Sequence, residues 1–365
     1  MVSIAIGLIR SVRYTRAVSG ELIPWSLWWT AVLLISFRDG MFLMADNRLN
    51  LADNLLLPLI SICIPTYQRP DLLAEALESC FAQTYAQFEI VIGDDSQDVD
   101  TEQLIARYES AHPGRIRYER HVPSLGQNRN VNDLFARAQG GRLLLLHDDD
   151  RLLPNALADL AKLWEALPTL DAAFGKQILI EHDGRPTVEE RTKALNDGYH
   201  RVAANAGRQS IPVVAGLQRM FPNDGFLVTT ELARTIGYRS MEEIGHACDT
   251  DFGLRLCAAA RDIWFLDEFT MQYRLTGESI SKYAIVAPYT YDMLAALRVP
   301  SAAESMLGEA RREIAPSAVS GFTQLGQPKR AWQVFQSSDY PLRKRFSARG
   351  IYHLLLIAKS FFAKH

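Results

Sequence analysis

Residues 59–70 read Leu-Ile-Ser-Ile-Cys-Ile-Pro-Thr-Tyr-Gln-Arg-Pro. The first six form a short apolar run rich in β-branched residues, and Pro65 closes it. Such a run is typical of a parallel strand that is buried on both faces. Pro70 and Asp71 then mark the start of a helix predicted over 71–84, where apolar residues recur at helical spacing. This stretch therefore predicts a β–α unit.

The chain repeats this alternation. Further strands are predicted at 88–92, 116–120, 143–146, 172–180, 226–229, 263–266 and 270–274, and further helices at 101–110, 130–138, 154–167, 231–235 and 251–260. The alternation predicts an α/β fold with a Rossmann-like, mostly parallel sheet wrapped by helices, whose ligands bind at the carboxyl ends of the strands. The polar stretch 181–210 has few apolar anchors and is predicted to be a mobile loop, a candidate lid.

Three regions are expected. Residues 58–281 hold the α/β domain, and residues 282–365 form a helical C-terminal region. Residues 1–57 form an N-terminal extension, in which the uncharged stretch 22–37 is shorter than the roughly 20 residues of a spanning helix. Its tryptophans and the arginines before it suit a membrane-associated segment at the interface. A disordered extension outside the fold is an equally plain interpretation.

Composition narrows the class of protein. With 48% hydrophobic residues, a chain of 365 residues can bury a substantial core. A net charge of −3 gives no indication of nucleic-acid binding. The four cysteines form no Cys-x-x-Cys pair, so we expect buried, reduced thiols in a cytoplasmic protein.

Three adjacent aspartates, Asp148, Asp149 and Asp150, follow the strand predicted at 143–146. Neighbouring carboxylates repel one another, so a structural role rarely needs three. In an extended segment Asp148 and Asp150 point to one side, and both could bind one hard divalent cation through oxygen. The alternative is an acidic cap ahead of a helix that starts near Pro154. We favour the metal site.

Three further sets of polar residues lie near strand or helix ends. In Gly93-Asp94-Asp95-Ser96 a carboxylate could accept hydrogen bonds from a base or a ribose, and the alternative is an ordinary turn. Arg129, near a helix start, could bind a diphosphate, and the alternative is a solvated surface arginine. Asp249 and Asp251 precede an apolar helix, so that one could cap it while the other acts as a base.

Six motifs follow one another in the chain: Ile62-Cys63-Ile64-Pro65-Thr66-Tyr67-Gln68-Arg69-Pro70, Gln83-Thr84-Tyr85, Phe88-Glu89-Ile90-Val91, Asp94-Asp95-Ser96, Asn128-Arg129-Asn130, and Asp148-Asp149-Asp150-Arg151-Leu152-Leu153-Pro154. Each is weak alone. In this order and spacing they resemble the family 2 glycosyltransferases of the GT-A fold, over about residues 59–281. The resemblance implies a GT-A domain that transfers a sugar from a nucleotide diphosphate to an acceptor hydroxyl with inversion.

The resemblance also implies a nucleotide site. It assigns contacts with the nucleotide to the first turn, with the Tyr67 ring near the base, to Asp94 or Asp95 at the base, and to Arg129 near the phosphates. The residues of the first turn are Pro65, Tyr67 and Arg69.

Metal binding and catalysis follow from the same resemblance. Asp148 and Asp150 bracket the metal motif, with Asp150 the expected direct ligand of Mg²⁺ or Mn²⁺ and Asp149 near the ribose or sugar. Asp249 matches the catalytic base, and Asp251 stays a rival because Cys248 stands where a Glu is common.

The late Tyr273-Arg274 pair matches another family motif. It implies that Arg274 helps to hold the leaving diphosphate. Thr276 stands where a His often follows this pair, which makes the late phosphate or metal contact less secure.

Two rival functions differ in their sequence signatures. A nucleotidyltransferase is expected to carry a Gly-rich phosphate loop after the first strand, and this chain has none there. A catalytically inactive sugar-nucleotide-binding protein is expected to lack Asp249 or the aspartate cluster, and both are present.

Fewer residues give information about the acceptor. Asp224, in the segment 221–225, is expected beside the acceptor, where it would bind a sugar hydroxyl. The resemblance implies a role in cell-surface polysaccharide or lipopolysaccharide synthesis, on a saccharide or lipid-linked acceptor. The basic amphipathic tail 351–364 could lie on the inner face of the cytoplasmic membrane or pack on its own domain.

Overall fold

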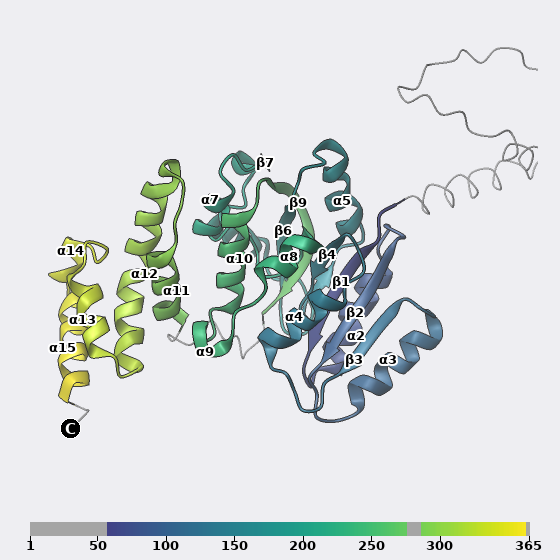
Figure 1. Cartoon of the computed structure of the whole chain (residues 1–365), viewed down its shortest axis with the longest axis horizontal. Coiled ribbons are helices and arrows are strands. Elements are labelled where there is room, and N and C mark those ends of the chain that lie inside the picture. The colour runs from purple at the N-terminus through teal and green to yellow at the C-terminus, as the bar shows by residue number, and fades with distance from the viewer. Residues whose placement is uncertain (1–56, 276–285, 363–365) are drawn as a thin grey trace, which may run out of the picture. The chain divides into compact units, whose positions relative to one another are not determined.

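The computed structural model describes residues 57–275 and 286–362, so the expectations for the N-terminal extension lie outside the described residues. Within these ranges one sheet holds the strands in the order β3-β2-β1-β4-β8-β6-β9-β5, and β7 pairs with β9 off this path (Figure 1). The strands are β1 (Ile60–Thr66), β2 (Phe88–Asp94), β3 (Ile116–Arg120), β4 (Arg142–Leu145), β5 (Arg151–Leu152), β6 (Ala172–Ile180), β7 (Gly207–Arg208), β8 (Phe226–Thr229) and β9 (Ile263–Arg274).

The sheet is parallel in its first half and mixed in its second. Strands β3, β2, β1 and β4 are all parallel, as predicted. Strand β8 runs antiparallel to both β4 and β6, while β9 runs parallel to β6. The predicted strands 263–266 and 270–274 are one strand, whose register against β6 shifts beside Lys176. The polar residues Asp267 and Glu268 sit at that irregularity, which explains the predicted break.

Helices cover both faces of the sheet (Figure 1). In the α/β part they are α2 (Pro70–Phe81), α3 (Asp100–Ala111), α4 (Gln127–Arg137), α5 (Ala156–Ala166), α6 (Glu189–Gly198), α7 (Pro212–Leu217), α8 (Thr230–Ile236), α9 (Met241–Ile244) and α10 (Cys248–Ala259). In the C-terminal region they are α11 (Val286–Ala296), α12 (Glu304–Gln324), α13 (Pro328–Gln336), α14 (Leu342–Arg345) and α15 (Ala348–Phe362). The described residues of this region, 286–362, are thus mostly helical.

Two hydrophobic cores lie on opposite sides of the sheet. Ile60, Ile62 and Ile64 of β1 pack into the core that α2, α3 and α5 cover. Cys63, on the other face of β1, packs into the core that α4, α8 and α10 cover. Because β1 is buried on both faces, it needs the continuous apolar run seen in the sequence. All four cysteines are buried and free, as expected.

The stretch 181–210 is not the loop that its polarity predicted. It contains α6, which packs on β6. Its anchors are polar: Asn196 Nδ2 donates to the Gln177 carbonyl at 2.8 Å, and the Leu179 N–H donates to Thr192 Oγ1 at 3.0 Å. Anchoring through side chain to backbone bonds leaves no apolar periodicity, so the sequence pattern missed this helix.

A further core joins the C-terminal helices among themselves. Buried side chains of α11, α12, α13 and α15 form it, together with Tyr340. A separate cluster that includes Leu217 of α7 and Leu307 of α12 links this region to the α/β part. Among residues 57–275 and 286–362, no helix combines the length and the apolar character that crossing a bilayer requires.

Candidate functional site

The carboxyl ends of β1, β2 and β4 meet at one edge of the sheet, and polar side chains join the turns that follow them. Thr66 Oγ1 donates to Asp148 Oδ2 at 2.8 Å, which links the turn after β1 to the triple aspartate. The backbone N–H of Gln68 donates to Ser96 Oγ at 2.8 Å, which links the same turn to the one after β2. The sequence motifs therefore come together as one site.

The turn after β1 presents an exposed aromatic ring. Tyr67 is 48% exposed, and Gln68 adopts the left-handed conformation with φ of 54°. Non-glycine residues rarely adopt this conformation, and those that do cluster at functional sites. The turn holds Tyr67 outward, where a planar base could stack on it.

Asp94 and Asp95 are both buried and hold the surrounding turns. Asp94 accepts hydrogen bonds from Tyr118 Oη at 2.7 Å and from the Ser96 N–H at 2.8 Å. Asp95 contacts His121 Nδ1 at 2.9 Å and accepts from the N–H groups of Leu125 and Gly126 at 3.1 and 2.8 Å. Asp94 thus forms the turn that the alternative interpretation predicted, and Asp95 fixes the segment that leads into α4.

Arg129 lies in the first turn of α4, directly after that segment. The helix starts at Gln127, three residues earlier than predicted, and its cap residue Gly126 has φ of 79°. Arg129 is exposed, and within the described residues it makes no ion pair. Its charge therefore adds to the partial positive charge of the helix start, a combination suited to phosphate oxygens.

The triple aspartate forms a turn and not an extended segment, because the Asp150 N–H donates to the His147 carbonyl at 3.2 Å. Asp148 and Asp149 therefore face Arg69, whose Nη1 lies 3.5 and 3.2 Å from their carboxylates. Asp150 faces Asp224 instead. The structure does not bring Asp148 and Asp150 together on one cation as the extended geometry predicted.

A second set of possible ligands surrounds Asp150. One ligand atom from each of His147, Asp150 and Asp224 lies within 4.8 Å of the others. Asp224 is fully buried, and its Oδ2 accepts the His147 N–H at 3.0 Å. Asp150 Oδ2 and Asp224 Oδ1 are buried without a hydrogen-bond partner. Two adjacent buried carboxylates with unpartnered oxygens fit a hard divalent cation.

The pKa values near this group reflect crowded negative charge. Burial and the neighbouring Asp224 carboxylate raise the pKa of Asp150. Burial, with the charge of Asp149, raises the pKa of Asp148 to about 6. Burial alone would lower the pKa of His147, but the carboxylates of Asp224 and Asp249 raise it to about 9. His147 and Arg69 offset this negative charge only in part, and a bound cation would offset more of it.

The two candidate bases differ in their partners. Helix α10 starts at Cys248, so both lie in its first turn, and neither is the cap residue. Asp249 accepts a hydrogen bond from Tyr238 Oη at 3.1 Å, and burial raises its pKa. Asp251, 1% exposed, is paired with both Arg239 and Arg255. The charges of His147 and Asp224 also act on the pKa of Asp249, which places Asp249 near the possible metal ligands.

Two predicted contacts do not fit the geometry. Arg274 is 3% exposed, and its guanidinium donates to the carbonyls of Asp149 and His182 and pairs with Glu75. Three of its five N–H donors therefore hold the turn after β4 and its neighbours, which supports a structural role in place of the predicted contact with a leaving diphosphate. Asp224 is also too deeply buried for the predicted contact with an acceptor hydroxyl.

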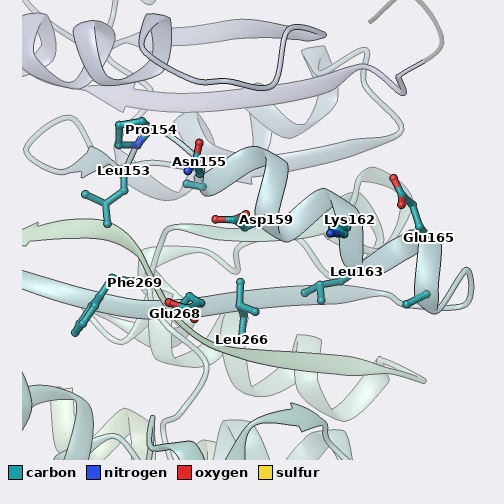
Figure 2. Close-up of a pocket in the computed structure, with 12 residues that line it drawn as sticks. Leu153, Pro154, Asn155, Asp159, Lys162, Leu163, Glu165, Leu266, Glu268 and Phe269 are labelled. Carbon is teal, nitrogen blue, oxygen red and sulfur yellow. The ribbon is translucent and has the colours of Figure 1, made fainter. Parts of the chain in front are cut away.

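Three residues near the site, His147, Tyr238 and Glu75, were not among those predicted from the sequence. His147 stands directly before the triple aspartate, which was a usable signal. A hollow of about 900 Å³ lies elsewhere, between α5 and the middle of β9, where Asp159, Lys162 and Phe269 line it (Figure 2). None of the predicted site residues lines this hollow.

Comparisons with known proteins agree on one family. The sequence model described as Glycosyl transferase family 2 matches residues 61–226. A Campylobacter jejuni GalNAc(5)-diNAcBac-PP-undecaprenol beta-1,3-glucosyltransferase is 31% identical over 140 residues, which are 38% of this chain and 44% of that protein. The chain spans less than half the length of the first curated relatives that it matches.

Solved structures share the fold. The S. aureus TarS structure in complex with UDP-GlcNAc aligns with a TM-score of 0.58 and 18% identity, covering 84% of this chain and 92% of that one. The Pyrobaculum calidifontis mannosyltransferase PcManGT, in complex with GDP-Man and Mn²⁺, aligns with a TM-score of 0.52 and 17% identity, covering 86% and 89%. At these identities the likeness establishes the GT-A fold.

Proposed function

Because the chain belongs to glycosyl transferase family 2 through residues 61–226, we propose that it transfers a sugar from a nucleotide diphosphate to an acceptor hydroxyl, with inversion. One observation carries the proposal within the structure. The buried carboxylates of Asp150 and Asp224 lie side by side with unpartnered oxygens, at the carboxyl end of β4. Such a pair is costly in an apolar interior unless a cation or an ordered polar group meets it.

We assign the cation to Asp150 and Asp224, with His147 beside them. Mg²⁺ suits the oxygen ligands, and Mn²⁺ accepts the imidazole as well. When bound, the ion would neutralise charge that develops on the departing diphosphate. Asp148 stays outside this ligand set, because Thr66 and Arg69 occupy its oxygens.

The nucleotide lies, in this proposal, across the ends of β1 and β2. The exposed ring of Tyr67 offers a stacking surface to the base, and the nearby Asp94 and Asp95 turns offer polar contacts. Arg129 and Arg69 bring positive charge to the phosphates from α4 and from the turn after β1. Asp149, which shares Arg69 with Asp148, borders the region of the ribose or sugar.

Asp249 acts as the base in this proposal. The oxygen of the acceptor hydroxyl attacks the anomeric carbon while the bond from that carbon to the diphosphate oxygen breaks. Asp249 takes the hydroxyl proton, and the nucleotide diphosphate leaves with the bonding electrons. One displacement inverts the configuration, and a positioned base contributes about 10²- to 10⁴-fold to the rate. Asp251 is unsuited to this role because two arginines hold it.

The test is to incubate the protein with UDP-, GDP- and dTDP-sugars in the presence of Mn²⁺ and to measure the released nucleotide diphosphate by chromatography. Because the acceptor is not identified, the assay is run both with water alone and with a set of candidate acceptors. The proposal predicts release from one donor, lost in Asp249→Asn. Nucleotide binding without release, with or without a set of candidate acceptors, would favour an inactive binding protein. Release of inorganic pyrophosphate from a nucleoside triphosphate and a sugar phosphate would favour a nucleotidyltransferase.

We propose a saccharide acceptor in cell-surface polysaccharide synthesis. The relative from Campylobacter supports a lipid-linked acceptor, since its name gives a PP-undecaprenol-linked saccharide. A reaction on such an acceptor takes place at a membrane surface. The described chain offers one surface suited to it.

That surface lies on α14 and α15. Helix α15 packs its buried residues Gly350, His353 and Ile357 inward. Ile351, Leu355 and Phe362 point the other way and are 55, 65 and 78% exposed. Their spacing of four and seven residues places them in one stripe along the helix. A helix that is apolar on both faces needs a second partner.

The charge of this region favours an anionic membrane as that partner. Residues 341–365 contain no Asp or Glu but carry six cations, among them the run Arg343-Lys344-Arg345 at α14. Phe346 and Leu342, 82 and 65% exposed, lie among these cations. Cationic residues beside exposed aromatic and aliphatic side chains are typical of helices that lie in the membrane interface. We propose that the α14–α15 surface holds the enzyme at the inner face of the cytoplasmic membrane.

A further inference from the structure

A buried arginine outside the nucleotide site lacks a negative partner. Arg201, in the segment between α6 and β7, is 3% exposed. Its Nε donates to the Met220 carbonyl at 2.8 Å and its Nη1 to Gln177 Oε1 at 2.5 Å. Both acceptors are neutral, and no carboxylate of the described residues forms an ion pair with Arg201. A buried cation without a directly paired counter-charge is unfavourable, so this position favours an anionic ligand.

A second arginine shares an aromatic ring with the first. The guanidinium carbons of Arg201 and Arg219 each lie 5.2 Å from the centroid of the Tyr199 ring. Arg219 Nη2 also donates to Tyr199 Oη at 3.4 Å. Arg219 itself is exposed, so the group is reachable from solvent. Two like charges at one ring repel each other, and a bridging anion would offset that repulsion.

The backbone around this Tyr199 cluster, which consists of Tyr199, Arg201 and Arg219, is strained. His200 and Arg219 have φ of 57° and 59°. In the described ranges, Gln68 of the nucleotide turn is the other non-glycine residue with positive φ. This conformation is energetically unfavourable for residues other than glycine, and residues that adopt it concentrate at ligand sites. The same kind of distortion thus marks the proposed nucleotide turn and the Tyr199 cluster.

The cluster adjoins the segment 221–225, which is expected from the sequence to lie beside the acceptor. Met220, whose carbonyl accepts a hydrogen bond from Arg201, directly precedes this segment, which contains Asp224. The charge of Asp224 partly offsets the effect of burial, which lowers the pKa of Arg201 to about 10. The proposed nucleotide contacts come from other elements, namely the ends of β1 and β2 and the start of α4.

We propose that Arg201 and Arg219 bind a phosphate or carboxylate group of the acceptor. Tyr199 contacts both guanidinium groups with its ring and accepts a hydrogen bond from Arg219. The inference rests on the proposed function, because it takes the ligand to be the second substrate. It restricts that substrate to anionic saccharides or phosphate-bearing acceptors. A neutral oligosaccharide would bring no negative charge to pair with the buried Arg201.

The probe is inorganic phosphate, titrated by calorimetry into the full-length protein at low ionic strength. We expect Arg219→Gln to weaken phosphate binding at least about tenfold, because a charged hydrogen-bonding partner is lost. Arg185→Gln is the control, since Arg185 is an exposed arginine that pairs with Asp183. Arg201→Gln should have the same effect as Arg219→Gln, and a melting curve checks its fold. Unchanged binding in folded Arg219→Gln and Arg201→Gln would overturn the proposal.

A second titration separates the acceptor from the donor. Phosphate is added to protein that already holds Mg²⁺ and a saturating nucleotide diphosphate. Binding that persists supports a separate acceptor site, whereas binding that disappears would assign the arginines to the donor's own diphosphate and overturn the assignment. Acetate in place of phosphate distinguishes a carboxylate from a phosphate ligand. If no nucleotide binds but phosphate binding depends on Arg219, the proposed function fails while the anion site stands.

Discussion

The backbone N–H of His147 donates to Asp224 Oδ2 at 3.0 Å and ties the end of β4 to the segment before β8. Antiparallel pairing of the two strands, with Leu144 opposite Leu227, brings these residues together. The bond also places Asp224 beside Asp150. The proposed metal site is therefore a product of strand pairing and not of the triple aspartate alone.

Asp224→Asn should weaken Mn²⁺ binding at least about tenfold, since even partners outside the coordination sphere typically contribute that much. The amide removes a negative charge but keeps the shape of the side chain. Titration of Mn²⁺ followed by electron paramagnetic resonance measures the effect without any donor. Asp159→Asn, an exposed aspartate of α5, serves as the control. Equal Mn²⁺ affinity in Asp224→Asn and wild type would remove Asp224 from the ligand set.

Asp249→Asn should reduce activity, whereas Asp251→Asn should reduce stability. The first should abolish sugar transfer while nucleotide affinity and melting temperature stay near wild type. The second should lower the free energy of unfolding by about 1–3 kcal/mol, less than for a fully buried pair, because Arg239 and Arg255 are partly exposed. Donor turnover and urea denaturation of both variants distinguish these roles. A stable Asp251→Asn protein without activity would reverse the assignment.

Stability of the C-terminal helices should fall as the pH drops below about 6.5, the ordinary pKa of histidine. His353 is 1% exposed. Its Nε2 lies 3.0 Å from Ser320 Oγ, and its Nδ1 lies 2.9 Å from Tyr340 Oη. Burial, with the charge of Arg349, lowers its pKa in the fold. The unfolded chain therefore binds more protons between the two pKa values, so acid favours unfolding.

Urea midpoints at pH 7.5 and 5.5 measure this effect of His353. His353→Gln should reduce the difference between the two midpoints, while His246→Gln, at an exposed histidine, should leave it unchanged. An undiminished difference in His353→Gln would assign the acid sensitivity to other groups.

Membrane binding should depend on the α14–α15 surface. The triple variant Ile351→Ser, Leu355→Ser and Phe362→Ser should lose flotation with vesicles that contain phosphatidylglycerol, because it removes the apolar stripe. Neutral phosphatidylcholine vesicles should bind less protein, and added salt should weaken binding to anionic ones. Val188→Ser, at a 62% exposed apolar residue elsewhere, is the control. A change in oligomeric state without any vesicle binding would mean that a second copy covers the stripe.

The sequence predicted the parallel half of the sheet because each of its main strands carries its own signal. The strand at 59–64 is a continuous apolar run, and Asp150 follows another such run. Asp224 was assigned to the acceptor because its neighbourhood depends on the β4–β8 pairing, which no local pattern records. Likewise, no sequence pattern around Arg274 indicates that its guanidinium pairs with Glu75 and donates to two carbonyls.

Polar anchoring explains the other differences. Helix α6 was missed because Asn196 and Thr192 hold it through backbone contacts, and such contacts leave no amphipathic pattern. Helix α10 begins at Cys248, three residues before the predicted start, so Asp249 and Asp251 share its first turn. Their different proposed roles then follow from Arg239 and Arg255, and the sequence alone did not identify these partners.

Calorimetric titration of UDP, GDP and dTDP into the full-length protein, with and without Mn²⁺, tests the central claim most directly. We predict that one nucleotide binds, that binding needs Mn²⁺, and that Asp150→Asn weakens it at least about tenfold. Binding of no nucleotide, or binding that is indifferent to both Mn²⁺ and Asp150, would contradict the account.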